Sequence, residues 1–276
     1  AVLSALECGA VKGGDIVDTS PGWMRLGGSL VKDFRNYGKL SLAEIIQHSN
    51  NMGTSKLALS VPKPFLLDTY YNMGLMSDTG INMPGESSGI FHERSRWSEF
   101  ELATLSFGYG ISVTTAQLAR MYSTIASGGI KRPLNIVKNT DNQAYKPGAE
   151  RVISEQNAKA IMAMMETVTQ EDGSGVKARI PGYRVAGKTG TSRKAVAGGY
   201  GEEYVNIFAG IAPLNDPQLV TVVLINEPGG DLYHAGDTAA PVFSEIMGGA
   251  LQLLNIAPDD RQVSATQVVE RSTNGG

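Results

Sequence analysis

Two short segments combine residue types that suit proton transfer and anion binding. Ser49 and Asn51 place a hydroxyl two residues from an amide, so one loop offers both a proton relay and a group that can hold a peptide. The segment from Lys188 to Thr191 offers a cation, two hydroxyls and a glycine at the end of an apolar run. Each also has an ordinary interpretation, the first as a polar cluster that ends a helix, the second as a strand end with an exposed lysine.

The second segment suits a sheet edge that binds a peptide. If its strand lies at an edge, an extended ligand can add alongside it through main-chain hydrogen bonds. Gly190 would let the ligand backbone approach closely, because a Cβ would block it. The hydroxyls of Thr189 and Thr191 suit a carboxylate, and Lys188 supplies the positive charge that such an anion needs. The backbone N–H of Thr191 would face a developing oxyanion.

Helices must position the first segment and strands the second. Capping and stop signals predict helices from Ser41 to about His48, through Lys56 to Pro62, from Pro64 to about Gly74, from Thr115 to about Gly128, from Ser154 to about Gly173, and from about Ala239 to Leu254. Apolar and β-branched runs predict strands over 183–191, 206–213 and 219–227. The glycines between Ser192 and Val205 predict a long, mobile hairpin loop. This order predicts an α+β fold, in which helices flank an antiparallel sheet.

Composition narrows the class of protein. The 276 residues are 42% apolar and 18% charged, which suits a sizeable core, and the net charge of −3 argues against a general nucleic-acid binder. One cysteine excludes an internal disulfide, and three scattered histidines predict no metal site and no cofactor. The chain begins inside a helical pattern, so we interpret residues 1–257 as the C-terminal portion of a larger domain. Residues 258–276 are polar and aperiodic, and we predict a disordered tail.

The order of the two segments carries a resemblance. Ser-x-Asn followed by Lys-Thr-Gly matches the second and third elements of the signature Ser-x-x-Lys, Ser-Asp-Asn, Lys-Thr-Gly. The segment Phe107–Thr114, the Pro84–Glu86 turn and Ala240–Phe243 are further similarities. From Leu3 to about Asp259 the chain resembles the transpeptidase domain of a septal class B penicillin-binding protein from a Gram-negative bacterium. Thr115 departs from the pattern, since many relatives carry Pro there.

The resemblance implies a peptidoglycan D,D-transpeptidase, whose substrates are stem peptides ending in D-Ala–D-Ala and whose serine is acylated by β-lactams. Carried over, Ser49 relays a proton to the leaving amine, Asn51 holds the substrate amide, and Lys188 shapes the electrostatics. Thr189 and Thr191, which flank Gly190, bind the terminal carboxylate. Tyr233 and His234 match a family position that forms a wall of the pocket. We therefore expect the two segments to face each other across one cleft.

The resemblance also implies surroundings that the sequence itself does not show. These are the periplasmic face of the bacterial inner membrane, an N-terminal part of the same protein that carries the membrane anchor, and membrane proteins of the division complex as partners.

The nucleophile of the family, a Ser-x-x-Lys motif, is expected upstream of Ala1. Three internal matches begin at Ser29, Ser60 and Ser174, and we interpret all three as chance matches. Ser29 follows a turn-rich stretch, Pro62 disturbs the second match, and Ser174 lies in a glycine loop. We therefore predict that the chain alone is inactive.

Two alternatives to a transpeptidase remain open. A serine β-lactamase or a D,D-carboxypeptidase can share the scaffold, and Glu86 is the tempting base for a lactamase, although the family gives its turn a structural role. A non-catalytic penicillin-recognising module gains support from the absent nucleophile. It gains none from Ser49, Asn51, Lys188 and Thr191, which such a module would have no need to keep.

Overall fold

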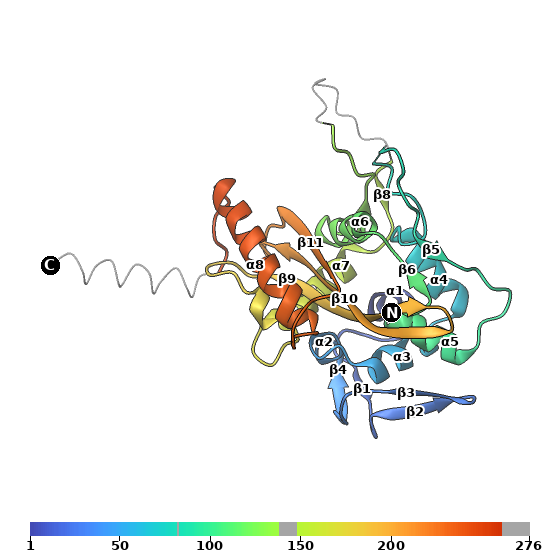
Figure 1. Cartoon of the computed structure of the whole chain (residues 1–276). Coiled ribbons are helices and arrows are strands. Elements are labelled where there is room, and N and C mark those ends of the chain that lie inside the picture. The colour runs from blue at the N-terminus through green and yellow to red at the C-terminus, as the bar shows by residue number, and fades with distance from the viewer. Residues whose placement is uncertain (82, 138–147, 261–276) are drawn as a thin grey trace. The chain divides into compact units, whose positions relative to one another are not determined.

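The fold is described from a computed structural model, which covers residues 1–81, 83–137 and 148–260 (Figure 1). The chain divides into two compact units, Ala1–Met164 and the part from Met165 onward, and the boundary falls inside helix α7 (Glu155–Glu166). The mixture of helices and antiparallel sheets confirms the predicted α+β class. No helix in the described ranges is both long enough and apolar enough to cross a bilayer.

The first unit combines helices with small two-stranded sheets. Before α7 its helices are α1 (Val2–Glu7), α2 (Leu42–Gln47), α3 (Asn51–Ser60), α4 (Lys63–Asn72), α5 (Glu99–Ser106) and α6 (Thr115–Ala126). Its antiparallel pairs are β1 (Ile16–Asp18) with β4 (Lys39–Ser41), β2 (Trp23–Leu26) with β3 (Ser29–Lys32), β5 (Ile90–Phe91) with β6 (Ile111–Ser112), and β7 (Ile130–Lys131) with β8 (Glu150–Arg151).

Local signals place these helices as the sequence predicts. Ser41 and Glu44 form a reciprocal capping box at the start of α2. Helix α3 ends at Ser60, just before Pro62, and α4 then starts with Pro64 in its first turn. The helix predicted from Ser154 is also present, since the Ser154 hydroxyl accepts from the Asn157 amide at 3.2 Å. Helix α5 was not among the predicted elements.

A small apolar cluster packs beneath the start of α3. Val31 of the β2–β3 hairpin, Met52 of α3 and Ala103 of α5 are all buried there, with Met24, Leu26, Phe100 and Phe107 packed around them. The Ser55 hydroxyl adds a buried hydrogen bond of 3.5 Å to the carbonyl of Ala103. The β2–β3 hairpin and α5 therefore hold the N-terminal turn of α3 in place.

The second unit is a three-stranded antiparallel sheet with a long helix packed on it. The strands β9 (Ala186–Val196), β10 (Gly199–Ala212) and β11 (Leu219–Asn226) lie in the order β11–β10–β9, followed in the chain by helix α8 (Ala235–Leu253) (Figure 1). Two 3₁₀ turns, η1 (Thr167–Thr169) and η2 (Val176–Ala178), precede the sheet. Phe208 of β10 and Phe243 of α8 are fully buried with ring centroids 4.7 Å apart, so they form the centre of the contact between sheet and helix.

The predicted loop from Ser192 to Val205 is wrong. Strands β9 and β10 continue past it and pair as far as Val196 with Gly199, which leaves a tight hairpin turn. The glycines serve this turn, where Gly198 has a φ of 87°, and an irregularity in β10 between Tyr200 and Tyr204. The glycine-rich segment is therefore part of a hairpin with an irregularity in one strand, and not a long loop.

Helix α8 also begins earlier than predicted, at Ala235 and not near Ala239. Pro241 consequently lies inside the helix and not in its first turn. The amide of Ala235, one of the unpaired donors of the first turn, binds the Thr191 hydroxyl of β9 at 2.9 Å. A tertiary contact therefore satisfies a donor at the start of α8, where the capping position His234 provides no side-chain hydrogen bond.

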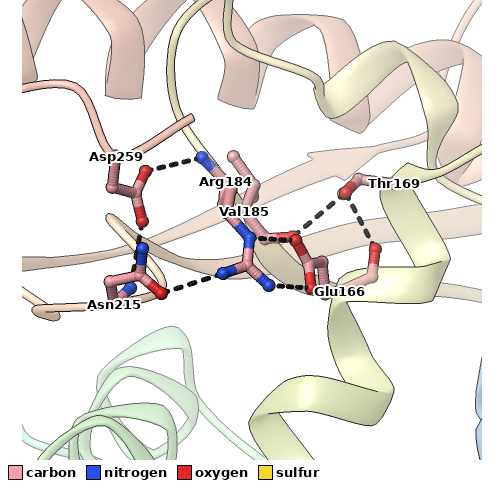
Figure 2. Close-up of polar contacts among 6 residues, drawn as sticks. All are labelled: Glu166, Thr169, Arg184, Val185, Asn215 and Asp259. Carbon is pink, nitrogen blue, oxygen red and sulfur yellow. Dashed lines mark hydrogen bonds and ion pairs between the residues drawn. The ribbon is translucent and has the colours of Figure 1, made fainter. Parts of the chain in front are cut away.

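A polar network fixes the chain where β9 begins (Figure 2). Arg184 donates two hydrogen bonds of 2.6 Å to the carboxylate of Glu166 and one of 2.8 Å to the side-chain oxygen of Asn215. Asp259 accepts from the backbone amides of Arg184 and Asn215 at 2.8 and 3.0 Å. Asp259, the second residue of the predicted tail, is therefore hydrogen-bonded within the second unit. Residues 261–276 lie outside the described residues.

Candidate active site

Ser49 lies on a tight connection between α2 and α3. Its φ of 53° is in the left-handed region, which is uncommon for a residue with a Cβ. The amide of Ser49 donates to Ile46 and that of Asn50 to Ile45, the paired contacts of a Schellman helix ending, where glycine is usual. Ser49 is solvent-exposed. The predicted relay residue is thus held in a strained, exposed position, a feature that is typical of functional sites.

The rest of the motif forms the start of α3. Asn50 is 1% exposed, and its side-chain oxygen accepts from the amide of Gly53 at 2.6 Å. Its side-chain nitrogen donates to Asp33 at 2.7 Å. The side chain of Asn51, which is predicted to hold the substrate amide, donates to the carbonyl of Lys32 at 3.2 Å. Both amides of the motif are therefore attached to the end of the β2–β3 hairpin.

Strand β9 forms an edge of the described sheet, because β10 is its neighbour and lies between it and β11. The peptide-addition hypothesis requires this position. Alternation along the strand puts Thr189 and Thr191 on the same face as Gly187, and Lys188 and Gly190 on the opposite face. The face with the threonines is the one that Phe208 and α8 occupy, since Thr189 lies opposite Phe208.

The two threonines are oriented by different partners. The hydroxyls of Thr189 and Ser174 are hydrogen-bonded at 2.9 Å. The hydroxyl oxygen of Thr191 accepts from the Ala235 amide at the start of α8. A hydroxyl that accepts in this way can still donate its hydrogen, so Thr191 can bind a carboxylate oxygen.

Lys188 is partly buried, and burial lowers its pKa to about 8. Its ammonium donates to the carbonyl of Thr189 at 3.0 Å. A lysine with this pKa is mostly protonated at neutral pH but loses its charge only slightly above it. It can therefore both attract an anion and take part in proton transfer.

Gly190 and Gly187 differ in what surrounds them. A Cβ added to Gly187 would lie 2.4 Å from the ring of Phe208, so internal packing requires glycine there. A Cβ on Gly190 would meet nothing closer than 3.8 Å, at Ile207. The packing of the described residues does not require glycine at position 190, which agrees with the hypothesis that a ligand approaches there.

Tyr233 and His234 lie next to β9 and β10 in the second unit. The ring of Tyr233 is 5.1 Å from that of Tyr204 and 4.2 Å from that of His234, and both predicted wall residues are exposed. The backbone of Tyr233 is fixed by Asn206, whose side-chain nitrogen donates to its carbonyl at 2.9 Å. Asn206 is buried and lies opposite Thr191 in the sheet.

The structure brings the predicted residues together in two groups. Ser49 and Asn51 lie in the first unit. In the second unit Asn206 connects Thr191 with Tyr233, whereas Lys188 lies on the opposite face of β9. Sequence reasoning did not assign a role to Asp33, Ser174 or Asn206, which hold these groups in place. Asn206 had a signal, because it is a polar residue at the start of an apolar run that becomes fully buried.

The internal Ser-x-x-Lys matches lack the geometry of a nucleophile and its base. Ser29 and Lys32 are three residues apart in strand β3, so their side chains point to opposite faces. Ser60 ends α3, whereas the lysine of that match begins α4. Lys177 pairs with Asp237 at 2.9 Å, and the hydroxyl of Ser174 binds Thr189.

Comparison with known families agrees with these features. The family model described as "Penicillin binding protein transpeptidase domain" matches residues 1–248. The chain belongs to the penicillin-binding transpeptidase family. The solved TP domain of penicillin-binding protein 3 from Burkholderia pseudomallei has the same fold, with a TM-score of 0.88 at 36% identity, covering 94% of this chain and 78% of that one.

Curated members of the family include proteins named for cell-wall synthesis. Peptidoglycan D,D-transpeptidase FtsI of Escherichia coli K12 is 45% identical over 259 residues, 94% of this chain and 43% of that protein. Probable peptidoglycan D,D-transpeptidase PbpC of Pseudomonas aeruginosa is 38% identical over 275 residues, 99% of this chain and 47% of that protein. The chain thus spans less than half the length of these transpeptidases.

Proposed function

We propose that this chain is part of a septal peptidoglycan D,D-transpeptidase that cross-links stem peptides through a serine acyl-enzyme and is acylated by β-lactams. The observation that carries the proposal is the placement of Lys188–Thr191 on an edge strand, in a chain that belongs to the penicillin-binding transpeptidase family. The 45% identity with a protein named FtsI supports the septal assignment.

In the proposed reaction the serine oxygen bonds to the carbonyl carbon of the penultimate D-Ala, and the terminal peptide bond breaks. Ser49 passes the serine proton to the departing D-Ala amine, while Asn51 holds the substrate amide. The amine of a second stem peptide then attacks the ester, forms the new amide bond and returns a proton to the serine. A β-lactam follows only the first step, because its amine stays tethered to the acyl group.

The edge strand would recognise the peptide end of the substrate. The backbone of β9 pairs with the extended stem peptide, and Gly190 leaves room for its close approach. The Thr189 and Thr191 hydroxyls bind the terminal carboxylate, and the Thr191 amide faces the oxyanion. Lys188, on the opposite face of β9, shapes the electrostatics with its positive charge. Tyr233 and His234 form one wall of the pocket.

The nucleophile and the cellular setting belong to the same proposal. The Ser-x-x-Lys motif lies upstream of Ala1, so the chain alone is inactive, and residues 1–257 form the C-terminal portion of the transpeptidase domain. The whole protein acts at the periplasmic face of the inner membrane with other division proteins, and residues 258–276 form a polar tail.

Incubation with a fluorescent penicillin tests the proposal. We expect the full-length protein to gain the mass of one penicillin, with the adduct mapped to a serine upstream of Ala1, and this chain alone to gain none. An adduct on Ser29, Ser60 or Ser174 would contradict the proposed nucleophile. A full-length protein without any adduct would contradict the enzyme and favour a non-catalytic penicillin-recognising module. A crystal structure of the adduct shows whether both motifs contact the bound drug.

The lifetime of the adduct separates the transpeptidase from a β-lactamase. Glu86, the tempting lactamase base, accepts from the amide of Thr79 at 2.7 Å and from its hydroxyl. These bonds lower the pKa of Glu86, although a general base that works near neutral pH benefits from a raised one. We therefore expect a long-lived adduct, whereas rapid turnover would favour the lactamase.

A further inference from the structure

The N-terminal turn of α3 is closed by a residue from outside the motif. Helices begin with amides that have no partner in their own helix. The Asn50 side chain satisfies the amide of Gly53, and Asp33 satisfies those of Asn51 and Met52, at 2.6 Å and 3.2 Å. One carboxylate thus serves two amides of the turn that follows Ser49, from a position 18 residues before Asn51.

The same carboxylate fixes the orientation of Asn50. The side-chain oxygen of Asn50 must face the amide of Gly53, so its nitrogen faces Asp33 and donates to it at 2.7 Å. The amide of Asn51 binds one carboxylate oxygen of Asp33 and the side chain of Asn50 binds the other. Rotation of either residue would break one of these bonds, and the loop therefore has one preferred geometry.

From these contacts we propose that Asp33 is a positioning residue for acylation: its carboxylate holds the Ser49–Asn51 loop in the geometry that the reaction needs. The inference rests on the proposed function. Asp33 touches neither substrate nor nucleophile in this scheme, and it acts through Asn50 and the backbone of Asn51. Reacting groups that are displaced by about 1 Å can lose about 100-fold in rate, so a change in this loop is expected to be visible in kinetics.

Burial of Asp33 supports a role beyond stability. Burial raises the pKa of its carboxyl above the ordinary value, although the amides of Asn51 and Met52 and the side chain of Asn50 pull it downward. The folded chain thus holds the ionised form at a cost. A carboxylate held at such a cost is better explained by what it positions than by the stability it provides.

Two substitutions separate the carboxylate from the hydrogen-bond pattern. Asp33→Asn is nearly isosteric but turns an N–H₂ toward the N–H₂ of Asn50, so two donors face each other. The double variant Asp33→Asn with Asn50→Asp reverses both partners. The new aspartate accepts from Gly53 and from the new asparagine, whose oxygen still accepts from Asn51, so the pattern is rebuilt. Asp18→Asn is the matched control, because Asp18 accepts from the nearby Ser20 amide at 2.8 Å.

The experiment measures the second-order rate of acylation of the full-length protein by fluorescent penicillin, with thermal unfolding as a check on folding. We expect Asp33→Asn to slow acylation by at least about 10-fold, the double variant to return within about threefold of the wild type, and Asp18→Asn to match it. A wild-type rate in Asp33→Asn, or no recovery in the double variant, would overturn the proposal. Rate recovery with the reversed pattern is a result that general destabilisation does not produce.

Hydrogen exchange distinguishes this inference from the proposed function. Exchange of the amides of residues 50–54 is followed by mass spectrometry, which requires no activity. We expect faster exchange in Asp33→Asn, recovery in the double variant and no change in Asp18→Asn. If the wild type is not acylated, the proposed function fails, and exchange alone decides whether Asp33 holds the loop. Unchanged exchange in Asp33→Asn overturns the inference.

Discussion

The two motif-bearing regions are anchored by opposite electrostatic means. Asp33 holds the start of α3 through amide donors, and burial raises its pKa. Arg184 holds the start of β9 through a two-point pair with Glu166, and these hydrogen bonds raise the pKa of Arg184 (Figure 2). For a carboxyl a raised pKa disfavours the charge, whereas for a guanidinium it favours the charge. Ionised Asp33, the first anchor, therefore costs folding stability, whereas charged Arg184, the second anchor, adds to it.

Removal of the second anchor gives the largest expected effect on stability. Arg184→Met leaves the carboxylate of Glu166, whose side chain is 15% exposed, without its cation, and removes the bond to Asn215. We expect the free energy of unfolding to fall by about 3 kcal/mol in urea titrations of the full-length protein. Lys159→Met, which breaks an exposed pair with Glu155, is the control and should cost less than about 0.5 kcal/mol. Equal losses of unfolding free energy in the two variants would contradict the assignment of Arg184 as the residue that anchors the start of β9.

Two glycines of β9 separate packing from ligand access. Gly187→Ala pushes a methyl group into the ring of Phe208, and we expect a loss of about 2 kcal/mol in unfolding free energy. Gly190→Ala has room, so unfolding should change by less than about 0.5 kcal/mol while acylation slows. Urea titration and the fluorescent-penicillin rate measure the two effects. A Gly190→Ala protein that acylates normally would mean that no ligand backbone approaches at this position.

The features that could be predicted from the sequence are those that local patterns specify. The motifs, the helix caps and the approximate strands were readable, because capping boxes, proline positions and apolar runs are local patterns. The contact between Asp33 and Asn50 joins residues 17 apart through a tertiary fold, and no periodicity reports it. The extension of β9 and β10 through residues 192–205 was missed because the glycines there serve a turn and an irregularity in the strand, and composition alone does not distinguish those from a loop.

The charge of Lys188 gives a smaller, pH-dependent effect within β9. Because its pKa is lowered to about 8, the fraction of ammonium falls above that pH and substrate carboxylates lose their cation. We expect the second-order acylation rate of the full-length protein to fall about 10-fold between pH 8 and pH 9.5. Lys188→Arg stays protonated throughout and should give a flat profile at a lower rate. A wild-type profile that is also flat to pH 9.5 would contradict the role of this charge.

The smallest expected effect compares two helix endings of the same shape. Ser49 follows α2 and Asn255 follows α8 in matching left-handed positions, with φ of 53° and 54°, and both close a Schellman ending. Ser49→Gly should raise the free energy of unfolding by about 0.5 kcal/mol, because glycine relieves the strain, and yet slow acylation by removing the proton relay. Asn255→Gly should change stability less, since Asn tolerates this conformation, and leave acylation unchanged. If Ser49→Gly destabilises the protein, the turn is not strained, and the trade of stability for function at the first motif is refuted.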